Sequence, residues 1–217
     1  MANRMDFKGI DTFILDLETV FLENNPNVDK ELYAYKTTYG LIDDDINKIT
    51  ELYNMITTYG NDDEEILRFN VDDNTYMLKD HVRDVFKILS KSKKIAYYAN
   101  DLLEVLHDKG YKVYYMYNIK DVSSFSKIET RPDINEFLDT FEGGITYCIT
   151  EDNPLSLQTI IPITYRKLIN DNTINEDTTM IIAPYKVIDY SGTHVGKYDK
   201  FSHSILKSLM NIEGASI

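Results

Sequence analysis

The chain has 217 residues, of which 43% are hydrophobic and 27% charged, which suits a single globular core with a modest insertion. Its formal net charge of −13 repels phosphate backbones, so we do not expect nucleic-acid binding. No apolar run approaches the ~18 residues of a membrane span, and the single cysteine, Cys148, excludes an intramolecular disulfide. We therefore expect a soluble cytoplasmic protein, or one assembled in a host cytoplasm, without membrane contact.

The first third of the chain combines one buried strand with helices. The apolar run Thr12–Leu17 predicts a strand covered on both faces. The frame E-L-Y-x-x-x-T-T-Y-G occurs at 31–40 and again at 51–60, which predicts a helical hairpin whose two helices end at glycines. Acidic residues at 43–45 favour the start of its second helix. Apolar positions on one face predict a further helix over 79–90.

From residue 93 onward, apolar strands alternate with helices. Strands are predicted at 95–98, 111–117, 145–150 and 179–183, and helices at 101–109, 134–140, 154–169 (kinked or split at Pro162) and 201–210. Gly143 and Gly144 are predicted to form a turn. The alternation predicts an α/β, three-layer, Rossmann-like core with a mainly parallel sheet, built from residues 1–21 and 94–217. Residues 22–93 would then be an inserted α-helical cap.

The predicted cap concentrates the negative charge. Residues 22–80 hold 14 acidic and 5 basic side chains, a net charge of −9 out of −13. Such a surface is either a solvated face or a docking face for a basic partner. In the second case, other protein subunits would be the partners and would dock on the acidic cap.

Two carboxylates follow the first strand, in the order Asp16-Leu17-Glu18-Thr19-Val20. In parallel sheets, functional sites lie at the carboxyl ends of the strands. Here the sequence resembles the haloacid dehalogenase (HAD) superfamily, whose first motif is a strand ending in D-x-D-x-T/V. The resemblance implies that Asp16 corresponds to the nucleophile and Glu18, which is one methylene longer, to the general acid/base. The family's second motif usually ends in Ser or Thr followed by Asn. Here Asn118 matches the Asn, but Tyr117 stands where the small hydroxyl side chain is expected.

Other departures affect charge and metal binding. Asn153 stands before Pro154, where the family has a lysine, and Ala183 and Pro184 stand where it has two acids that hold Mg²⁺. We therefore interpret Asp16, Glu18, Tyr117, Asn118, Asn153, Ala183 and Pro184 as a vestigial pocket, with no catalytic residue and no cofactor.

The resulting hypothesis is a non-enzymatic structural or interaction protein on a degenerate HAD-like fold. The abundance of Ile, Lys, Asn and Tyr indicates an A/T-rich genome, so a component of a virus or phage particle is its specific form. The alternative is a Mg²⁺-dependent phosphatase or nucleotidase with Asp16 as nucleophile, Glu18 as acid/base and Lys120 or Lys186 replacing the missing lysine. An acidic regulator of an unrelated α/β fold is the third possibility.

Overall fold

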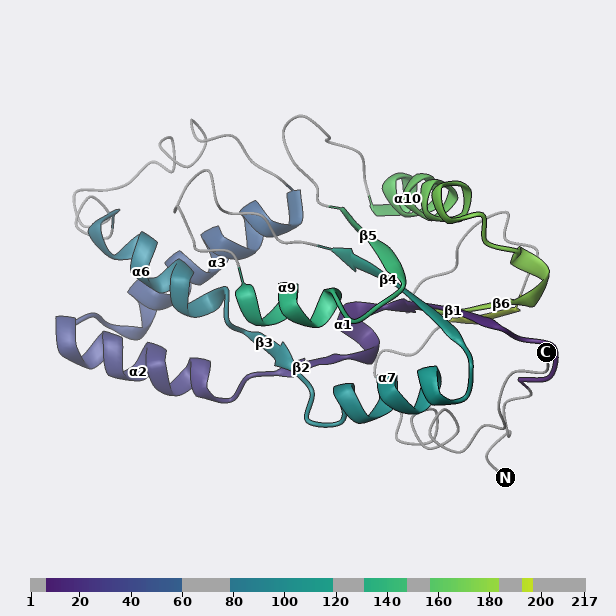
Figure 1. The fold of residues 1–217 in the computed structure, drawn as a ribbon. Coiled ribbons are helices and arrows are strands. Elements are labelled where there is room, and N and C mark those ends of the chain that lie inside the picture. The colour runs from purple at the N-terminus through teal and green to yellow at the C-terminus, as the bar shows by residue number, and fades with distance from the viewer. Residues whose placement is uncertain (1–6, 60–78, 119–130, 148–156, 184–192, 197–217) are drawn as a thin grey trace, which may run out of the picture.

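A computed structural model describes residues 7–59, 79–118, 131–147, 157–183 and 193–196 (Figure 1). The predicted helix at 201–210 and the predicted core position of Cys148 lie outside these residues.

The centre of the fold is a parallel sheet. Its described strands are β1 (Thr12–Asp16), β4 (Lys112–Asn118), β5 (Gly143–Tyr147), β6 (Thr179–Ala183) and β7 (Thr193–Gly196). They lie in the order β5-β4-β1-β6-β7, and every neighbouring pair is parallel. All residues of β1 are buried, as expected for a central strand covered on both faces. The predicted α/β fold with a mainly parallel sheet is confirmed.

Helices cover both faces of this sheet, as Figure 1 shows. They are α7 (Ala99–Asp108) and α9 (Pro132–Leu138) on one side and α10 (Leu157–Asn172) on the other. Side chains alternate along a strand, so Phe13 and Leu15 join the hydrophobic cluster of α7 and α9, whereas Ile14 joins that of α10. The two clusters enclose β1 on both faces, as they also enclose β6.

A helical region lies between β1 and α7 in the sequence. Its elements are α1 (Leu17–Val20), β2 (Leu22–Asn24), α2 (Asn27–Tyr39), α3 (Asp43–Tyr59), α6 (Lys79–Leu89) and β3 (Lys93–Ile95). We call α2, α3 and α6 the cap helices, because they share a hydrophobic cluster of their own. They lie to one side of the sheet in Figure 1, joined to it through β2 and β3. The exact division of the chain at residues 21 and 94 stays a prediction.

Local sequence explains how the cap helices begin and end. Gly40 follows α2 with φ 68°, a left-handed conformation that glycine adopts without the steric cost of a side chain. The three aspartates at 43–45 form the first turn of α3, where the helix dipole favours negative charge. The buried face of α6 matches its predicted apolar positions: Val82, Val85, Phe86 and Leu89.

Some predicted elements differ from the structure. The first strand ends at Asp16 instead of Leu17, because Asp16 caps α1. The predicted strand at 95–98 is β3, which pairs with β2 in antiparallel fashion and stays outside the main sheet. Strand β7 was not predicted. Pro162 does not split helix α10, because the packing of the helix's buried face against the sheet outweighs the lost backbone hydrogen bond.

The predicted turn at Gly143 and Gly144 is also wrong, since both residues belong to β5. A Cβ atom on Gly144 would lie 2.4 Å from Cδ1 of Tyr115, whose ring packs against Phe141 with centroids 5.3 Å apart. Glycine is therefore required here by the close approach of a ring, and the strand tolerates it.

Gly144→Ala should lower the free energy of unfolding by roughly 1–3 kcal/mol, because the Tyr115 ring must leave its packed position. Gly143→Ala is the matched control: its new Cβ would lie 3.3 Å from Oδ1 of Asn172, so a smaller loss is expected. Urea denaturation measures both. Equal stability of Gly144→Ala and the wild type would contradict the close approach.

Candidate functional site

Asp16 is the last residue of the central strand β1 and only 5% exposed. Its Oδ1 accepts a hydrogen bond from the backbone N–H of Thr19 at 2.8 Å, which caps the one-turn helix α1. Aspartate is among the preferred residues for this position, since its carboxylate satisfies a free N–H at the start of the helix. The turn thus orients the Asp16 carboxylate at the carboxyl edge of the sheet.

Strand β4 brings two further predicted site residues to this edge. The register pairs Asp16 with Met116, so Tyr117 and Asn118 follow just beyond Asp16 along the neighbouring strand. Tyr117 is partly buried and packs against the cluster on the α7 and α9 side. The structure therefore brings Asp16, Tyr117 and Asn118 to the same strand ends, as expected from parallel pairing.

Strand β6 flanks Asp16 on the opposite side. Leu15 pairs with Ile182, which places Ala183 level with Asp16. Ala183 is 4% exposed and offers no side-chain ligand. The remaining predicted residues, Asn153 and Pro184, lie outside the described residues.

Glu18 lies in the single turn of α1, two residues after Asp16. Its side chain is 33% exposed, and Oε1 lies 3.7 Å from the Nζ atom of Lys93 in β3. The strand that leads back from the cap thus provides a positive charge beside the candidate acid/base. Sequence reasoning missed this pair, because 75 residues separate its members and nothing local links them.

A tyrosine from the cap helices shares the electrostatic environment of this edge. Burial raises the pKa of Tyr53 in α3 to about 12, with further influence from the charges of Tyr117, Arg131 and Glu18. Burial likewise raises the pKa of Tyr117, while Arg131 lowers it and Glu18 raises it. Tyr53 packs edge-on against Phe86, with ring centroids 5.2 Å apart. The cap therefore meets the core beside the candidate site, and both phenols stay protonated at neutral pH.

The charge of Arg131 acts on Tyr53 and Tyr117, and the sequence pattern did not single this residue out as a candidate site residue. Its Nε and Nη2 atoms donate to the two carboxylate oxygens of Asp133 at 2.9 and 2.7 Å. This hydrogen bond raises the pKa of Arg131 and lowers that of Asp133. The helix predicted at 134–140 begins two residues earlier in the structure, because Pro132 begins α9 and places Asp133 in its first turn. A proline at a helix start followed by an acid is the signal that could have found this turn.

The described part of the chain does not by itself form a metal site. Within it, no group of three or more His, Cys, Asp or Glu side chains could hold a metal ion. The substitute lysines Lys120 and Lys186 lie outside the described residues. The expectation of no cofactor therefore stays a prediction, as does the docking of protein subunits on the acidic cap.

Comparison with known proteins identifies the fold. No model of a protein family matches the sequence, and no curated protein matches it significantly. Among solved structures, a hydrolase from Streptococcus pneumoniae TIGR4 matches with a TM-score of 0.52 and 12% identity over 94% of this chain and 100% of the other. A HAD family enzyme from Bacteroides thetaiotaomicron matches with a TM-score of 0.50 and 16% identity over 92% of this chain and 99% of the other. The wild-type form of this enzyme, in complex with magnesium and inorganic phosphate, matches with a TM-score of 0.50 and 15% identity. This match covers 91% of the present chain and 98% of the other.

These matches confirm the resemblance to the HAD-like superfamily at the level of the fold. They contradict the hypothesis of a non-enzymatic structural protein and of a virus or phage component, because the structures that share the fold are hydrolases and HAD enzymes. That hypothesis depended on Asn153, Ala183, Pro184 and Tyr117. Ala183 offers no side-chain ligand at the end of β6, whereas Asn153 and Pro184 lie outside the described residues. No helix among the described residues is both long and apolar enough to cross a membrane.

Proposed function

From the HAD-like fold that this chain has, we propose that it is a phosphomonoester hydrolase with Asp16 as nucleophile. The observation that carries the proposal is the position of Asp16: a buried carboxylate at the end of the central strand, oriented by the N–H of Thr19. Parallel α/β folds place their chemistry at this edge. Because Asp16 is buried in a structured turn, the position of its carboxylate is set before the substrate binds, which favours a role as the attacking group.

Glu18 is the proposed general acid/base. In the first step the Asp16 carboxylate attacks phosphorus, the bond from phosphorus to the ester oxygen breaks, and protonated Glu18 gives its proton to that oxygen. In the second step water attacks the aspartyl phosphate, and Glu18 takes a proton from the water. Inorganic phosphate leaves, and both carboxyl groups return to their starting states.

Magnesium dependence forms part of the proposal. One HAD enzyme of the same fold was solved with magnesium and phosphate. The described residues of this chain do not fit a metal site by themselves, so we derive no step through a metal. Lys93, which lies 3.7 Å from Glu18, and Arg131, whose charge acts on Tyr117, provide positive charge that would attract a phosphate dianion.

The test is hydrolysis of p-nitrophenyl phosphate and a panel of nucleoside monophosphates, with and without Mg²⁺. We expect metal-dependent release of phosphate that stops after chelation. Folded protein that releases no phosphate under either condition would overturn the proposal.

Glu18→Gln should lower kcat by roughly 10²- to 10⁴-fold with an alkyl phosphate substrate, because the leaving alkoxide then lacks a proton donor. With p-nitrophenyl phosphate, whose leaving group is a weak base, the first step should lose less, as measured by the burst of p-nitrophenol in rapid-quench kinetics. Equal losses of the first step with both substrates would exclude Glu18 as the acid.

A further inference from the structure

Two segments connect the cap helices to the core, and they are bonded to each other. We call them the cap linkers: residues 24–26 lead into α2, and residues 90–93 return from α6. The backbone N–H of Asn25 donates to the carbonyl of Ser92 at 2.9 Å, and its Nδ2 donates to the carbonyl of Lys91 at 3.0 Å. The pairing of β2 with β3 continues this contact toward the core. The linkers therefore form one structural unit.

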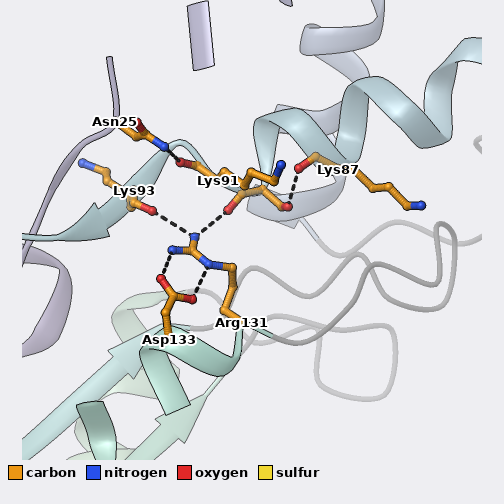
Figure 2. Close-up of polar contacts among 7 residues, drawn as sticks. Asn25, Lys87, Lys91, Lys93, Arg131 and Asp133 are labelled. Atoms are coloured by element: carbon orange, nitrogen blue, oxygen red, sulfur yellow. Dashed lines mark hydrogen bonds and ion pairs between the residues drawn. The ribbon is translucent and has the colours of Figure 1, made fainter. Parts of the chain in front are cut away.

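Arg131 ties this unit to the core, as Figure 2 shows. Its Nη1 donates to the carbonyls of Ser90 at 3.1 Å and Lys93 at 2.9 Å, at the two ends of the returning linker. On its other side the guanidinium binds Asp133 through two hydrogen bonds. Hydrogen bonds from an ionised donor are about twice as strong as neutral ones, and a bidentate pair also fixes orientation. The Arg131 side chain is 24% exposed, which limits competition from water.

The same contact leads to the candidate site. Lys93 accepts a hydrogen bond from Arg131 through its carbonyl and pairs with Glu18 through its ammonium group. Glu18 belongs to the turn that Asp16 caps. A displacement of the returning linker would therefore move the ammonium group away from Glu18 and shift the cap helices with it.

We propose that Arg131, oriented by Asp133, is a positioning residue that holds the returning cap linker and thereby sets Lys93 against Glu18. The structural part of this proposal, that Arg131 holds the linker, concerns the linker alone. The catalytic part rests on the proposed function, because Arg131 would act on the reaction through Glu18.

Hydrogen exchange with mass spectrometry tests the structural part without any substrate. Arg131→Met should speed exchange of peptides within 87–98 at least about tenfold, since about two charge-assisted hydrogen bonds are lost. Exchange within β1 and β6 should stay unchanged. Arg166→Met is the matched control: it removes another arginine–carboxylate pair, with Glu176 at 2.9 Å, on the opposite side of the sheet. Wild-type exchange of 87–98 in Arg131→Met would overturn the proposal.

Two milder variants cover the case in which Arg131→Met does not fold. Asp133→Asn keeps the arginine charge but weakens its orientation, and Arg131→Lys keeps a cation that can donate to at least one of the two carbonyls. We expect both variants to show faster exchange in 87–98 than the wild type. Exchange in Arg131→Lys should be slower than in Asp133→Asn and in Arg131→Met. Wild-type exchange in both would likewise overturn the proposal.

Steady-state kinetics, corrected for the folded fraction, tests the catalytic part. Arg131→Met should lower kcat at least about tenfold with KM changed less than about twofold, since it disturbs the site rather than substrate affinity. Arg131→Lys should restore part of kcat, and Arg166→Met should match the wild type. Faster exchange with unchanged kcat would show a purely structural role and overturn the catalytic part. An inactive wild type would refute the proposed function and the catalytic part, while hydrogen exchange would still decide the structural part.

Discussion

Asp16→Asn is expected to reduce phosphate release by at least about a thousandfold while leaving the fold intact. The amide is a poor nucleophile, so the covalent step fails, whereas its oxygen can still accept the hydrogen bond from the N–H of Thr19. Loss of activity without loss of structure is therefore the specific result of removing the nucleophile. Steady-state kinetics and circular dichroism of the same preparation measure both properties.

A direct control looks for the intermediate. Acid quenching during turnover of a ³²P-labelled phosphomonoester should leave label on the wild-type chain at Asp16 and none on Asp16→Asn. Thr19→Ala is a second control, because it keeps the backbone N–H that Asp16 binds and should retain most activity. Full activity of Asp16→Asn would exclude it as nucleophile, even if the protein proves to be a phosphatase.

Short-range patterns predicted much of the fold. The bounds of β6 match the prediction, because a fully apolar run between turn residues has few alternatives. The end of α2 at Gly40 and the start of α3 at Asp43 also follow from local chemistry, a left-handed glycine and an acidic first turn. Such signals act within a few residues and need no knowledge of the rest of the chain.

The contacts around the candidate site depend on segments far apart in the sequence. Arg131 binds carbonyls 41 and 38 residues away, and its partners are backbone atoms that carry no sequence signature. Tyr53 was part of a repeated helical frame, and nothing in that frame indicated that its phenol would lie in the field of Arg131 and Glu18. Long-range packing decided both. Sequence reasoning could therefore place residues at the strand ends, among them Asp16, Tyr117 and Ala183, but not the contacts of Arg131 and Tyr53.

The wrong functional hypothesis has a related origin. It treated Ala183 and Asn153 as losses of essential charge, assuming that each role must be filled at the family's own position. The structure instead places Lys93 beside Glu18, and the charge of Arg131 acts on Tyr117. Charge at a site is a property of the folded surroundings rather than of single motif positions.

Phe21→Ala should lower the free energy of unfolding by about 3–5 kcal/mol, a large share of the ~5–15 kcal/mol typical of a domain. Phe21 is fully buried directly after α1, and its ring packs against Phe137 at 5.4 Å and Phe141 at 5.3 Å between centroids. Its backbone also links two segments, since its carbonyl accepts a hydrogen bond from Ala96 at 2.8 Å. Truncation would leave a cavity beneath the turn that orients Asp16.

Phe21→Leu and Tyr97→Ala separate this effect from general loss of aromatic surface. The leucine refills most of the cavity and should cost less, and Tyr97 is 80% exposed, so its removal should change stability by under about 0.5 kcal/mol. Urea denaturation gives all three values. Because the cavity lies beside α1, Phe21→Ala should also lower phosphatase activity per folded molecule, whereas Tyr97→Ala should not. A loss below 1 kcal/mol for Phe21→Ala would show that this aromatic cluster does not support the site.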